Sequence, residues 1–463
     1  MGTRRTFLSA SIAAAAVASA GIPAGAEQLG DRGPGKPVKP QPPDAELKQI
    51  LREIDHRRIE AIVRKLASFG TRHTLSSQDD PVRGIGASRD WIFAEMSKWA
   101  NENMKVELQS YIQQPAPPRI PEAVRITNVM ATLRGSTSPD RIYVVSGHYD
   151  SRCTDANDFT KDAPGANDDA SGVAVSMELA RIMSKRRPEA TIVFAAVAGE
   201  EQGLHGARHM ATQYKAAGAD IQAMFTNDII GSSTADDGTR DPRTVRLFAE
   251  GVPTAETPAE ANTRRSVGGE NDSSSRQLSR FVRSVAVNDA TGMNVRVIYR
   301  RDRYLRGGDH IPFLEQAYPA ARFTEPNENY AHQHQDVRVE NGVQFGDLPE
   351  FCDFPYIARV AKVNAATLWS LANGPGTPKG VRINTSRLTN ETDLLWQRGT
   401  EPDLAGYEVV WRETTANDWT HYIDVGDVTK AVIDLSKDNV FFGVRAYDKA
   451  GHRSPVAFPT PQS

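Results

Sequence analysis

The stretch that decides the fold runs from residue 145 to residue 201 and contains three polar segments, Gly147-His148-Tyr149-Asp150-Ser151, Pro164-Gly165-Ala166-Asn167-Asp168-Asp169-Ala170-Ser171-Gly172 and Gly199-Glu200-Glu201-Gln202-Gly203. Each segment lies at the end of an apolar run or at the start of a helical one. Acidic and imidazole groups therefore gather where strands end and helices begin, which is where open α/β sheets bind ligands. The three segments predict a metal site on an α/β framework.

The composition is that of a globular protein with more than one domain. The 463 residues exceed the usual size of one domain, and 39% of them are hydrophobic while 24% are charged. The net charge of −3 lacks the strong basic excess of a nucleic-acid-binding protein, so no nucleic-acid partner is expected. No apolar run reaches the roughly 20 residues that span a bilayer, so no transmembrane anchor is expected.

The N-terminus has the pattern of an export signal. Arg4-Arg5 is followed by Phe7-Leu8 and an alanine-rich run, and Ala24-Gly25-Ala26 offers small residues for cleavage. We therefore predict a twin-arginine signal peptide over residues 1–26 and a periplasmic or extracellular protein. The proline-rich segment 27–44, which has almost no large apolar residue, predicts an extended linker.

The chain has two cysteines, Cys153 and Cys352. Two thiolates are too few for a structural zinc site made of cysteines. In an exported protein the pair could form one disulfide, and two unpaired buried thiols are the equal alternative.

Apolar periodicity predicts an α/β domain over residues 45–373. Spacings of three and four predict helices at 45–66 (one helix or a close pair), 88–99, 171–183, 204–214, 275–288, 311–316 and 349–371. Alternating and β-branched runs predict strands at 106–112, 126–133, 142–145, 191–197, 223–230, 295–299 and 320–324. This alternation favours a mixed, mainly parallel sheet between layers of helices. The polar residues 232–275 are predicted to be partly a surface loop.

A glycine- and proline-rich linker at 374–378 precedes a different pattern. Short alternating runs at 394–396, 406–411, 431–433 and 441–447 predict a small all-β sandwich over residues 379–460. Trp396, the strand 406–411 and the ending Val444-Arg445-Ala446-Tyr447 resemble a fibronectin type III domain. Such a domain could contact substrate or a cell wall, or serve as a spacer.

His148 follows the predicted strand at 142–145 and therefore lies at its carboxyl end. A neutral imidazole is a good zinc ligand. Asp150 could accept the N–H of the other ring nitrogen and fix the tautomer. Taken alone, this pair would be better explained as a structural hydrogen bond.

Asp168 and Asp169 are adjacent acids at the start of a predicted helix. Neighbouring carboxylates repel each other unless solvent or a cation lies between them, and the positive end of the helix favours one of them. We predict that Asp168 bridges two metal ions, because one carboxylate can place one oxygen on each ion. Asp169 or Ser171 could also cap the helix.

Glu200 and Glu201 follow the predicted strand at 191–197. Two buried glutamates at a strand end are costly without a cation nearby. In a non-helical turn the two side chains point different ways, so Glu201 can be a ligand while Glu200 acts as general base on the attacking water. The alternative is a pair that caps the next helix.

Two further groups complete the predicted set. Asp228 ends another strand, and His332 lies in a polar loop before the last helix, where His334 is a rival. Two imidazoles and three carboxylates match two zinc ions that share one water molecule. The predicted ligands are His148, Asp168, Glu201, Asp228 and His332.

Residues 120–345 resemble the catalytic domain of the co-catalytic zinc aminopeptidases typified by bacterial leucyl aminopeptidase, which are related to glutamate carboxypeptidase. The resemblance rests on the three opening segments together with Asn227-Asp228, Asp309-His310 and the spacing His332-x-x-x-Asp336. It implies a zinc exopeptidase fold, two zinc ions, the five ligands above and Glu200 as the base. The family places its last histidine four residues before an aspartate, and Asp336 therefore favours His332 over His334.

The activity implied by the resemblance is removal of N-terminal residues from peptide substrates. A carboxypeptidase or dipeptidase on the same scaffold is the first alternative. A single-zinc glutaminyl cyclase follows, and then an inactive protein in which the β sandwich is the binding part. A second open question concerns four arginines. They could form a solvated basic loop or bind an acidic group of the substrate: Arg300, Arg301, Arg303 and Arg306.

Overall fold

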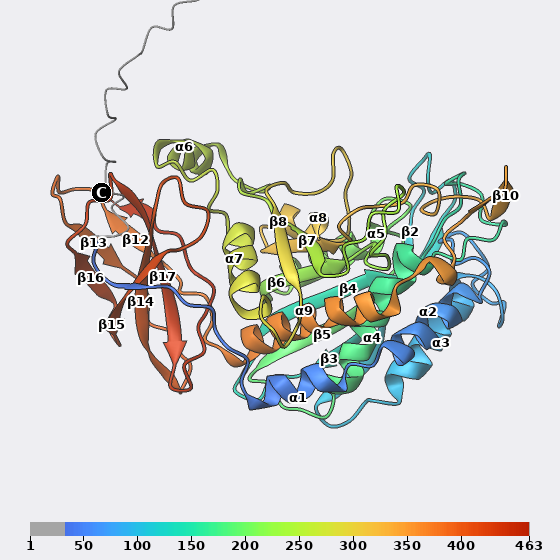
Figure 1. Ribbon diagram of the computed structural model, residues 1–463, viewed down its shortest axis with the longest axis horizontal. Coiled ribbons are helices and arrows are strands. Elements are labelled where there is room, and N and C mark those ends of the chain that lie inside the picture. The colour runs from blue at the N-terminus through green and yellow to red at the C-terminus, as the bar shows by residue number, and fades with distance from the viewer. Residues whose placement is uncertain (1–32, 463) are drawn as a thin grey trace, which may run out of the picture.

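The computed structural model describes residues 33–462, which form an α/β domain and a C-terminal pair of β sheets (Figure 1). The predicted signal peptide at 1–26 and the start of the predicted linker lie outside the described residues. Within residues 33–462 no helix has both the length and the apolar character needed to cross a membrane.

A mixed sheet of eight strands forms the centre of the α/β domain, in the order β2-β3-β5-β4-β6-β9-β7-β8. The central strands β5, β4, β6 and β9 run parallel, and β2 and β3 pair antiparallel with their neighbours. Strand β7 pairs antiparallel with β9 and parallel with β8. The predicted mixed, mainly parallel sheet is thus confirmed. The strands are β2 (Met104–Gln113), β3 (Val124–Leu133), β4 (Ser138–His148), β5 (Ala190–Val197), β6 (Asp220–Asn227), β7 (Thr244–Phe248), β8 (Asn294–Ile298) and β9 (Ala320–Thr324).

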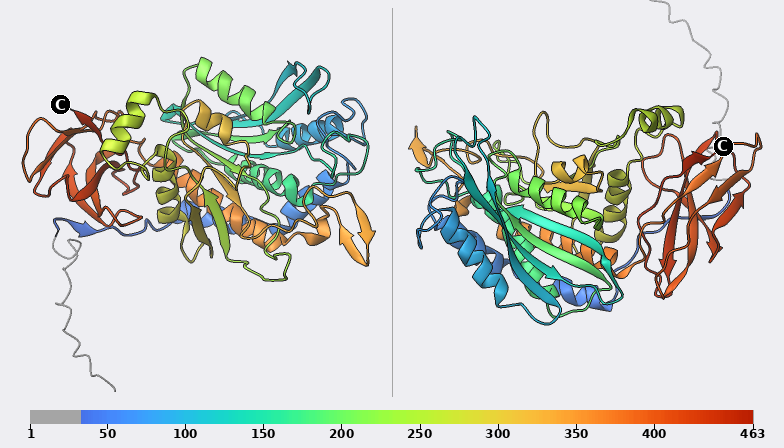
Figure 2. Two further views of the ribbon diagram at one scale, coloured as in Figure 1. Left: turned by 90° about the horizontal axis from the view of Figure 1, so that it is seen from above. Right: turned by 180° about the vertical axis from the view of Figure 1, so that it is seen from behind.

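Helices cover both faces of this sheet (Figure 2). One face shares its core with α1, α2, α3, α4, α7 and α9, and the other face shares its core with α5 and α8. The helices are α1 (Ala45–Glu53), α2 (His56–Ala67), α3 (Ile85–Ser97), α4 (Ser171–Met183), α5 (His205–Ala216), α7 (Ser274–Ala286), α8 (Ile311–Glu315) and α9 (Phe354–Asn373).

The central strands are apolar throughout because both of their faces are buried. Along β4, Tyr143 and Val145 enter the core beneath α4, whereas Val144 between them enters the core beneath α5. A strand packed on one face alone would have alternated apolar with polar residues. The continuous apolar run at 142–145 therefore predicted a central strand, and the structure has one there.

Four elements of the α/β domain were not predicted. Strand β7 and helix α6 (Pro258–Ser266) lie within the polar stretch 232–275, and a hairpin of β10 (Arg338–Glu340) and β11 (Val343–Phe345) projects near the end of the domain. Helix α6 buries none of its residues. It is set by a local capping box between Thr257 and Glu260 instead of by an apolar face, so the apolar pattern could not reveal it.

The C-terminal part consists of two four-stranded sheets, ordered β1-β15-β14-β17 and β16-β13-β12-β18. Their side chains share a core built around Trp396, Tyr407 and Trp411. The strands are β12 (Arg382–Asn384), β13 (Thr392–Leu395), β14 (Leu404–Glu413), β15 (His421–Gly426), β16 (Lys430–Ile433), β17 (Val440–Asp448) and β18 (Thr460–Gln462). Two sheets face to face agree with the predicted sandwich architecture.

The described part of the predicted extended linker 27–44 contacts the sandwich. Residues Lys36–Pro37 form strand β1, which pairs antiparallel with β15 of the sandwich. Trp411 donates a hydrogen bond from Nε1 to the main-chain oxygen of Pro34 at 2.7 Å. Main-chain pairing needs no apolar side chain, so a polar, proline-rich composition did not exclude it.

The two parts are joined by a buried charged cluster around Asp272. Arg280 and Gln277 of α7 donate to its Oδ1 at 2.8 and 2.9 Å, and Arg412 of β14 donates to its Oδ2 at 2.7 Å. Trp419 of the sandwich also donates to Gln277 at 2.9 Å. Because these groups are removed from water, each charge depends on its partner across the junction. The sandwich is therefore docked on the α/β domain by charged and polar contacts.

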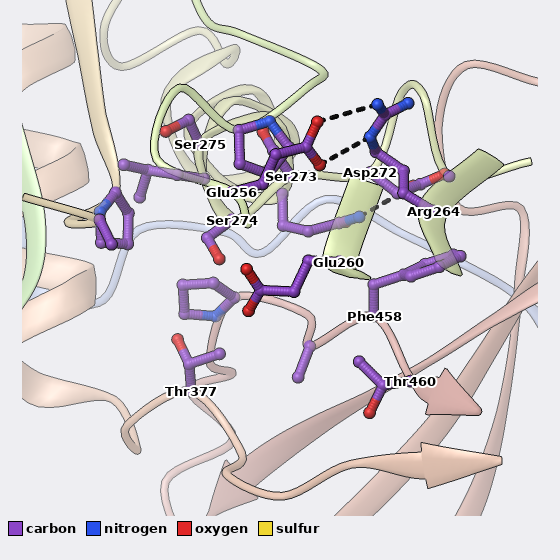
Figure 3. A pocket seen from close by; sticks show the side chains of 18 of the residues that line it. Glu256, Glu260, Arg264, Asp272, Ser273, Ser274, Ser275, Thr377, Phe458 and Thr460 are labelled. Atoms are coloured by element: carbon purple, nitrogen blue, oxygen red, sulfur yellow. Dashed lines mark hydrogen bonds and ion pairs between the residues drawn. The ribbon is translucent and has the colours of Figure 1, made fainter. Parts of the chain in front are cut away.

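A cavity of about 830 Å³ lies at the same junction (Figure 3). Glu256 and Arg264 form an ion pair on the α6 side, and Phe458 and Thr460 line the sandwich side. Its lining includes Asp220, at the amino end of β6. The cavity thus lies toward the end of the sheet opposite to the predicted metal site.

The two cysteines are not bridged. Cys153 is buried near the loop at 155–158, where its Sγ lies 3.4 Å from the main-chain oxygen of Asp155. Cys352 precedes α9 and is half-buried. Of the two alternatives for this pair, the structure has the unpaired thiols.

Replacing Asp272 by asparagine should destabilise the protein, because two buried guanidinium groups lose their counter-charge. We expect the free energy of unfolding to fall by about 3–5 kcal/mol in urea denaturation followed by tryptophan fluorescence. Asp418 is the matched control, since it pairs with Arg283 across the same junction with both side chains over 40% exposed. Its change to asparagine should cost less than about 1 kcal/mol. Equal effects of the two substitutions would contradict a buried, coupled cluster.

Candidate metal centre

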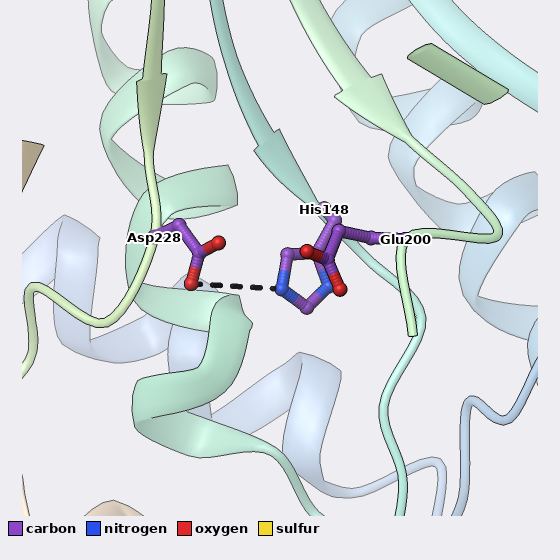
Figure 4. A group of neighbouring side chains, drawn as sticks. All are labelled: His148, Glu200 and Asp228. Carbon is purple, nitrogen blue, oxygen red and sulfur yellow. Dashed lines mark ion pairs between the residues drawn. The ribbon is translucent and has the colours of Figure 1, made fainter. Parts of the chain in front are cut away.

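Three neighbouring strands bring the predicted site together. His148 is the last residue of β4, Glu200 and Glu201 follow β5, and Asp228 follows β6. Since β5, β4 and β6 are adjacent and parallel, their carboxyl ends meet at one edge of the sheet. Figure 4 shows His148, Glu200 and Asp228 converging there from three separate segments. Asp168 joins them from the turn before α4.

Six side chains form two adjoining clusters that could each hold a metal ion. His148, Glu200 and Asp228 make one, and Asp168, Glu201 and His334 make the other, with the ligand atoms of each cluster within 4.8 Å of one another. Nitrogen and carboxylate oxygen together form a donor set typical of zinc.

Asp168 connects the two clusters through its two oxygens. Oδ1 lies 3.0 Å from Nε2 of His148, and Oδ2 lies 2.8 Å from Nε2 of His334. Nε2 of His334 also lies 2.9 Å from Oε1 of Glu201. One carboxylate therefore faces both imidazoles, which is the arrangement predicted for a bridging ligand.

The prediction of His332 as the last ligand was wrong, because the structure brings His334 into the cluster. The His332 ring stacks on Phe351 instead, with 3.6 Å between ring centroids and 9° between the planes. His334 has a φ of 55°, in the left-handed region that residues other than glycine seldom adopt. Asp336, which guided the choice of His332, makes a surface ion pair with Lys161 at 3.0 Å.

The predicted role of Asp150 also needs correction. Nδ1 of His148 is hydrogen-bonded at 3.1 Å to the main-chain oxygen of Asp150, while the nearest carboxylate oxygen is 3.5 Å away. The carboxylate instead accepts main-chain N–H bonds from Glu200 and Glu201 at 3.2 and 3.1 Å, and a bond from the Thr74 hydroxyl at 3.1 Å. Asp150 thus orients the imidazole through its backbone and the two glutamates through its side chain.

Two further carboxylates hold the backbone around Asp168. Asp169 accepts N–H bonds from His148 and Gly172, both at 2.9 Å, and so connects β4 to the first turn of α4. Asp347 accepts the N–H groups of Asn167 and Asp168 at 2.8 and 2.7 Å. Sequence reasoning missed Asp347, which lies about 180 residues away and has no motif around it.

Glycine is required where β4 meets α4. A Cβ atom added at Gly172 would lie 2.1 Å from the main-chain oxygen of Asn227, and one added at Gly147 would lie 2.3 Å from the backbone of Gly172. Neither backbone atom can move without displacing β6 or α4. The two glycines therefore allow the helix to approach the sheet closely enough to place Asp168 beside His148.

The site concentrates buried negative charge. Burial raises the pKa of Asp309 to about 8, with a smaller opposing effect from His148. Burial likewise raises the pKa values of Glu200 and Asp169 well above the ordinary range, and His148 again opposes the rise. A bound cation would stabilise these carboxylates in their charged form, so the donor set fits a metal.

The pKa of His334 is also raised, but by neighbouring charges and against the effect of burial. Burial alone would lower its pKa, but the charges of Glu201 and Asp168 outweigh that effect and raise the pKa to about 10. A proton on this ring occupies the position that a cation would otherwise fill between the same two carboxylates. Zinc binding should therefore displace a proton from the cluster.

Polar atoms without partners lie next to the two clusters. Among the described residues, neither carboxylate oxygen of Asp309 has a hydrogen-bond partner. Buried polar atoms are normally paired, so such atoms indicate a ligand, a water molecule or an ion. The motif Asp309-His310 was recognised in the sequence, but the buried, unpartnered carboxylate of Asp309 was not predicted.

The arginine-rich segment is not a freely solvated loop. Nη1 of Arg303 lies 3.2 Å and Nη1 of Arg306 lies 2.9 Å from the same oxygen of Glu328, and Arg303 also pairs with Asp302 at 3.1 Å. Arg300 packs over the ring of Tyr304. Two of the four arginines are thus already paired with acids of the chain.

The chain is similar over nearly its whole length to fungal proteins. Residues 128–340 match peptidase family M28. A probable zinc metalloprotease of Leptosphaeria maculans is 56% identical over 427 residues, covering 92% of this chain and 99% of the relative. A probable zinc metalloprotease of Pyricularia oryzae is 54% identical over 436 residues, covering 92% of this chain and 87% of the relative.

Solved structures give more distant likenesses. The LapA aminopeptidase of Legionella pneumophila is 17% identical with a TM-score of 0.49, covering 71% of this chain and 75% of that chain. A glutaminyl cyclase of Fimbriiglobus ruber is 20% identical with a TM-score of 0.49, covering 72% of this chain and 99% of that chain. At these levels neither likeness indicates a reaction for this chain.

Alanine at His334 should impair zinc binding, whereas alanine at His332 should not. The first change removes the nitrogen donor from the cluster of Asp168 and Glu201, and the second removes only a ring stacked on Phe351. We expect the zinc affinity of His334→Ala to fall by more than about 100-fold, beyond the usual effect of losing an outer partner. Elemental analysis of both folded variants after dialysis measures this. Equal zinc content would contradict the choice of His334.

Proposed function

Because the chain belongs to peptidase family M28, we propose that it is a zinc metalloprotease that removes N-terminal residues from peptides with the help of two zinc ions. His148 and Asp228 would hold one ion, Glu201 and His334 the other, and Asp168 both. The observation that carries this proposal is the pair of contacts from the two oxygens of Asp168 to different imidazoles, at 3.0 and 2.8 Å.

The residues around the ligands fit this chemistry. When bound, the two zinc ions would lower the pKa of a water molecule and polarise the scissile carbonyl. Asp150 holds the main chain of Glu200 and Glu201, so the two side chains diverge from a fixed turn. Glu201 then serves as a ligand, and Glu200 takes the proton of the attacking water and passes it to the leaving amine.

The charge of the site supports an aminopeptidase. The N-terminus of a peptide carries an ammonium group, and carboxylates stabilise it. Asp309 offers two buried oxygens without partners, and Glu200 lies in the adjoining cluster with Asp228. Arg303 and Arg306 are paired with Glu328, so they are less suited to holding a C-terminal carboxylate.

A carboxypeptidase is the second candidate, and one residue favours it. Nε of Arg152 is buried without a hydrogen-bond partner and lies 3.9 Å from Oε2 of Glu201. A guanidinium next to the catalytic groups could bind a substrate carboxylate. A single-zinc cyclase accounts for less, because it leaves the His148 and Asp228 cluster unexplained.

Changing Glu200 to glutamine should remove the base and keep the metal. We expect turnover to fall by about 10²- to 10⁴-fold while the zinc content stays at the wild-type level. Glu201→Gln is the matched control, since it alters the neighbouring residue and should lose zinc as well as activity. Near-normal turnover in Glu200→Gln would exclude Glu200 as the base.

A substrate panel separates the two peptidase readings. Aminoacyl p-nitroanilides with a free amino group should be cleaved, and their N-acetylated forms should not, because acetylation removes the ammonium charge that Asp309 would hold. Initial rates are measured by the absorbance of released nitroaniline. Cleavage of N-blocked peptides from their C-terminus would instead support the carboxypeptidase, and Arg152→Gln should then raise the KM for those peptides.

A further inference from the structure

Arg322 is a fully buried cation in the middle of β9, directly beside Asp228. Its Nη1 lies 2.7 Å from Oδ2 of Asp228, and its Nη2 donates a hydrogen bond to the main-chain oxygen of Asp228 at 3.2 Å. A charge in a fully buried strand is costly unless a partner compensates it. Here one guanidinium contacts both the side chain and the backbone of a single residue.

Strand β9 determines the position of Asp228 almost entirely. The N–H of Asp228 donates to the main-chain oxygen of Phe323 at 3.1 Å, while its carbonyl and carboxylate are contacted by Arg322. The next residue, Ile229, has a φ of 59°, which is rare for a β-branched residue and turns the chain away at once. With Oδ2 engaged by Arg322, Oδ1 is the oxygen that faces Nε2 of His148, at 3.9 Å.

Arg322 is itself held by the segment before α8. Its Nη1 donates to the main-chain oxygen of Gly307 at 2.9 Å and lies 3.5 Å from Oδ2 of Asp302. A Cβ atom at Gly308 would lie 2.7 Å from Nη1, so the backbone closes tightly over the guanidinium. Asp302 also forms an ion pair with Arg303, with 3.1 Å between Oδ1 of Asp302 and Nε of Arg303. The guanidinium therefore has little freedom to move away from Asp228.

We propose that Arg322 is a positioning residue that holds Asp228 as a one-oxygen ligand for the zinc ion on the His148 side. This inference rests on the proposed function, since it presupposes two bound ions. The planar guanidinium is suited to the task, because it reaches the carboxylate, the carbonyl of Asp228 and the carbonyl of Gly307 at the same time. A lysine ammonium carries the same charge but lacks this forked geometry.

Geometry and charge make opposite predictions for this residue. If Arg322 acts by positioning, Arg322→Lys and Arg322→Met both release Asp228 and weaken the binding of one zinc ion. If only its charge mattered, Arg322→Lys would bind zinc like the wild type, and Arg322→Met would bind it more tightly because a repelling cation is gone. The two variants together therefore separate the two effects.

The test is zinc binding by the full-length protein in buffers of graded free zinc concentration, with bound zinc measured by elemental analysis. We expect both Arg322 variants to lose one of two ions at a free zinc concentration about 10- to 100-fold higher than the wild type does. The other ion should be retained as in the wild type. Arg322→Lys keeps the buried charge, so it remains informative if Arg322→Met fails to fold by circular dichroism.

Arg246→Lys is the matched control. Arg246 lies on the adjacent strand β7 and is also largely buried, but it pairs with Glu328 at 3.1 Å and does not contact Asp228. Its zinc binding should equal that of the wild type. Wild-type zinc affinity in Arg322→Lys, or tighter binding in Arg322→Met, would overturn the positioning role. Fewer than two ions in the wild type would instead overturn the proposed function.

Discussion

The structure depends on one shared carboxylate. Asp168 directs its two oxygens to two imidazoles that are almost 190 residues apart in the chain, His148 and His334. This contact requires β4, the turn before α4 and the loop after β9 to meet at one point. It also concentrates negative charge in a buried place, where only a cation or protons on the ring nitrogens can balance it. Much of the surrounding structure can be understood as support for that point.

The support comes mainly from acids that bind backbone N–H groups. Asp150 holds the turn of Glu200 and Glu201, Asp169 connects β4 to α4, and Asp347 holds the main chain of Asp168. Such bonds fix the position of a ligand without competing for the metal. Arg322 extends the same principle from the opposite side by holding a carboxylate with a cation. The position of the predicted ligands is thus fixed by many residues outside the ligand set.

The β sandwich is integrated with the α/β domain. Strand β1, which precedes the α/β domain in the chain, completes a sheet of the sandwich, and the Asp272 cluster joins α7 to β14. Separating the two parts would be energetically costly, because each buried charge at the junction would lose its partner. The geometry is that of a fixed unit more than of a tethered module, and the junction lies away from the metal centre.

Local patterns in the sequence determined most of the elements and most of the site. The apolar runs predicted the central strands. Because parallel strands end at the same edge of a sheet, the polar residues that follow these runs were predicted to be neighbours: His148, Asp168, Glu200, Glu201 and Asp228. Helix α6 and strand β1 were not predicted, because a capping box and main-chain pairing define them and apolar spacing does not. The choice between His332 and His334 could not be made from spacing, since both lie in one polar loop. Only the tertiary structure decided it: a left-handed turn at His334 directs that ring to Asp168, and packing on Phe351 holds the other away. The same holds for Asp347 and Arg322, whose roles come from contacts between distant segments that no local pattern records.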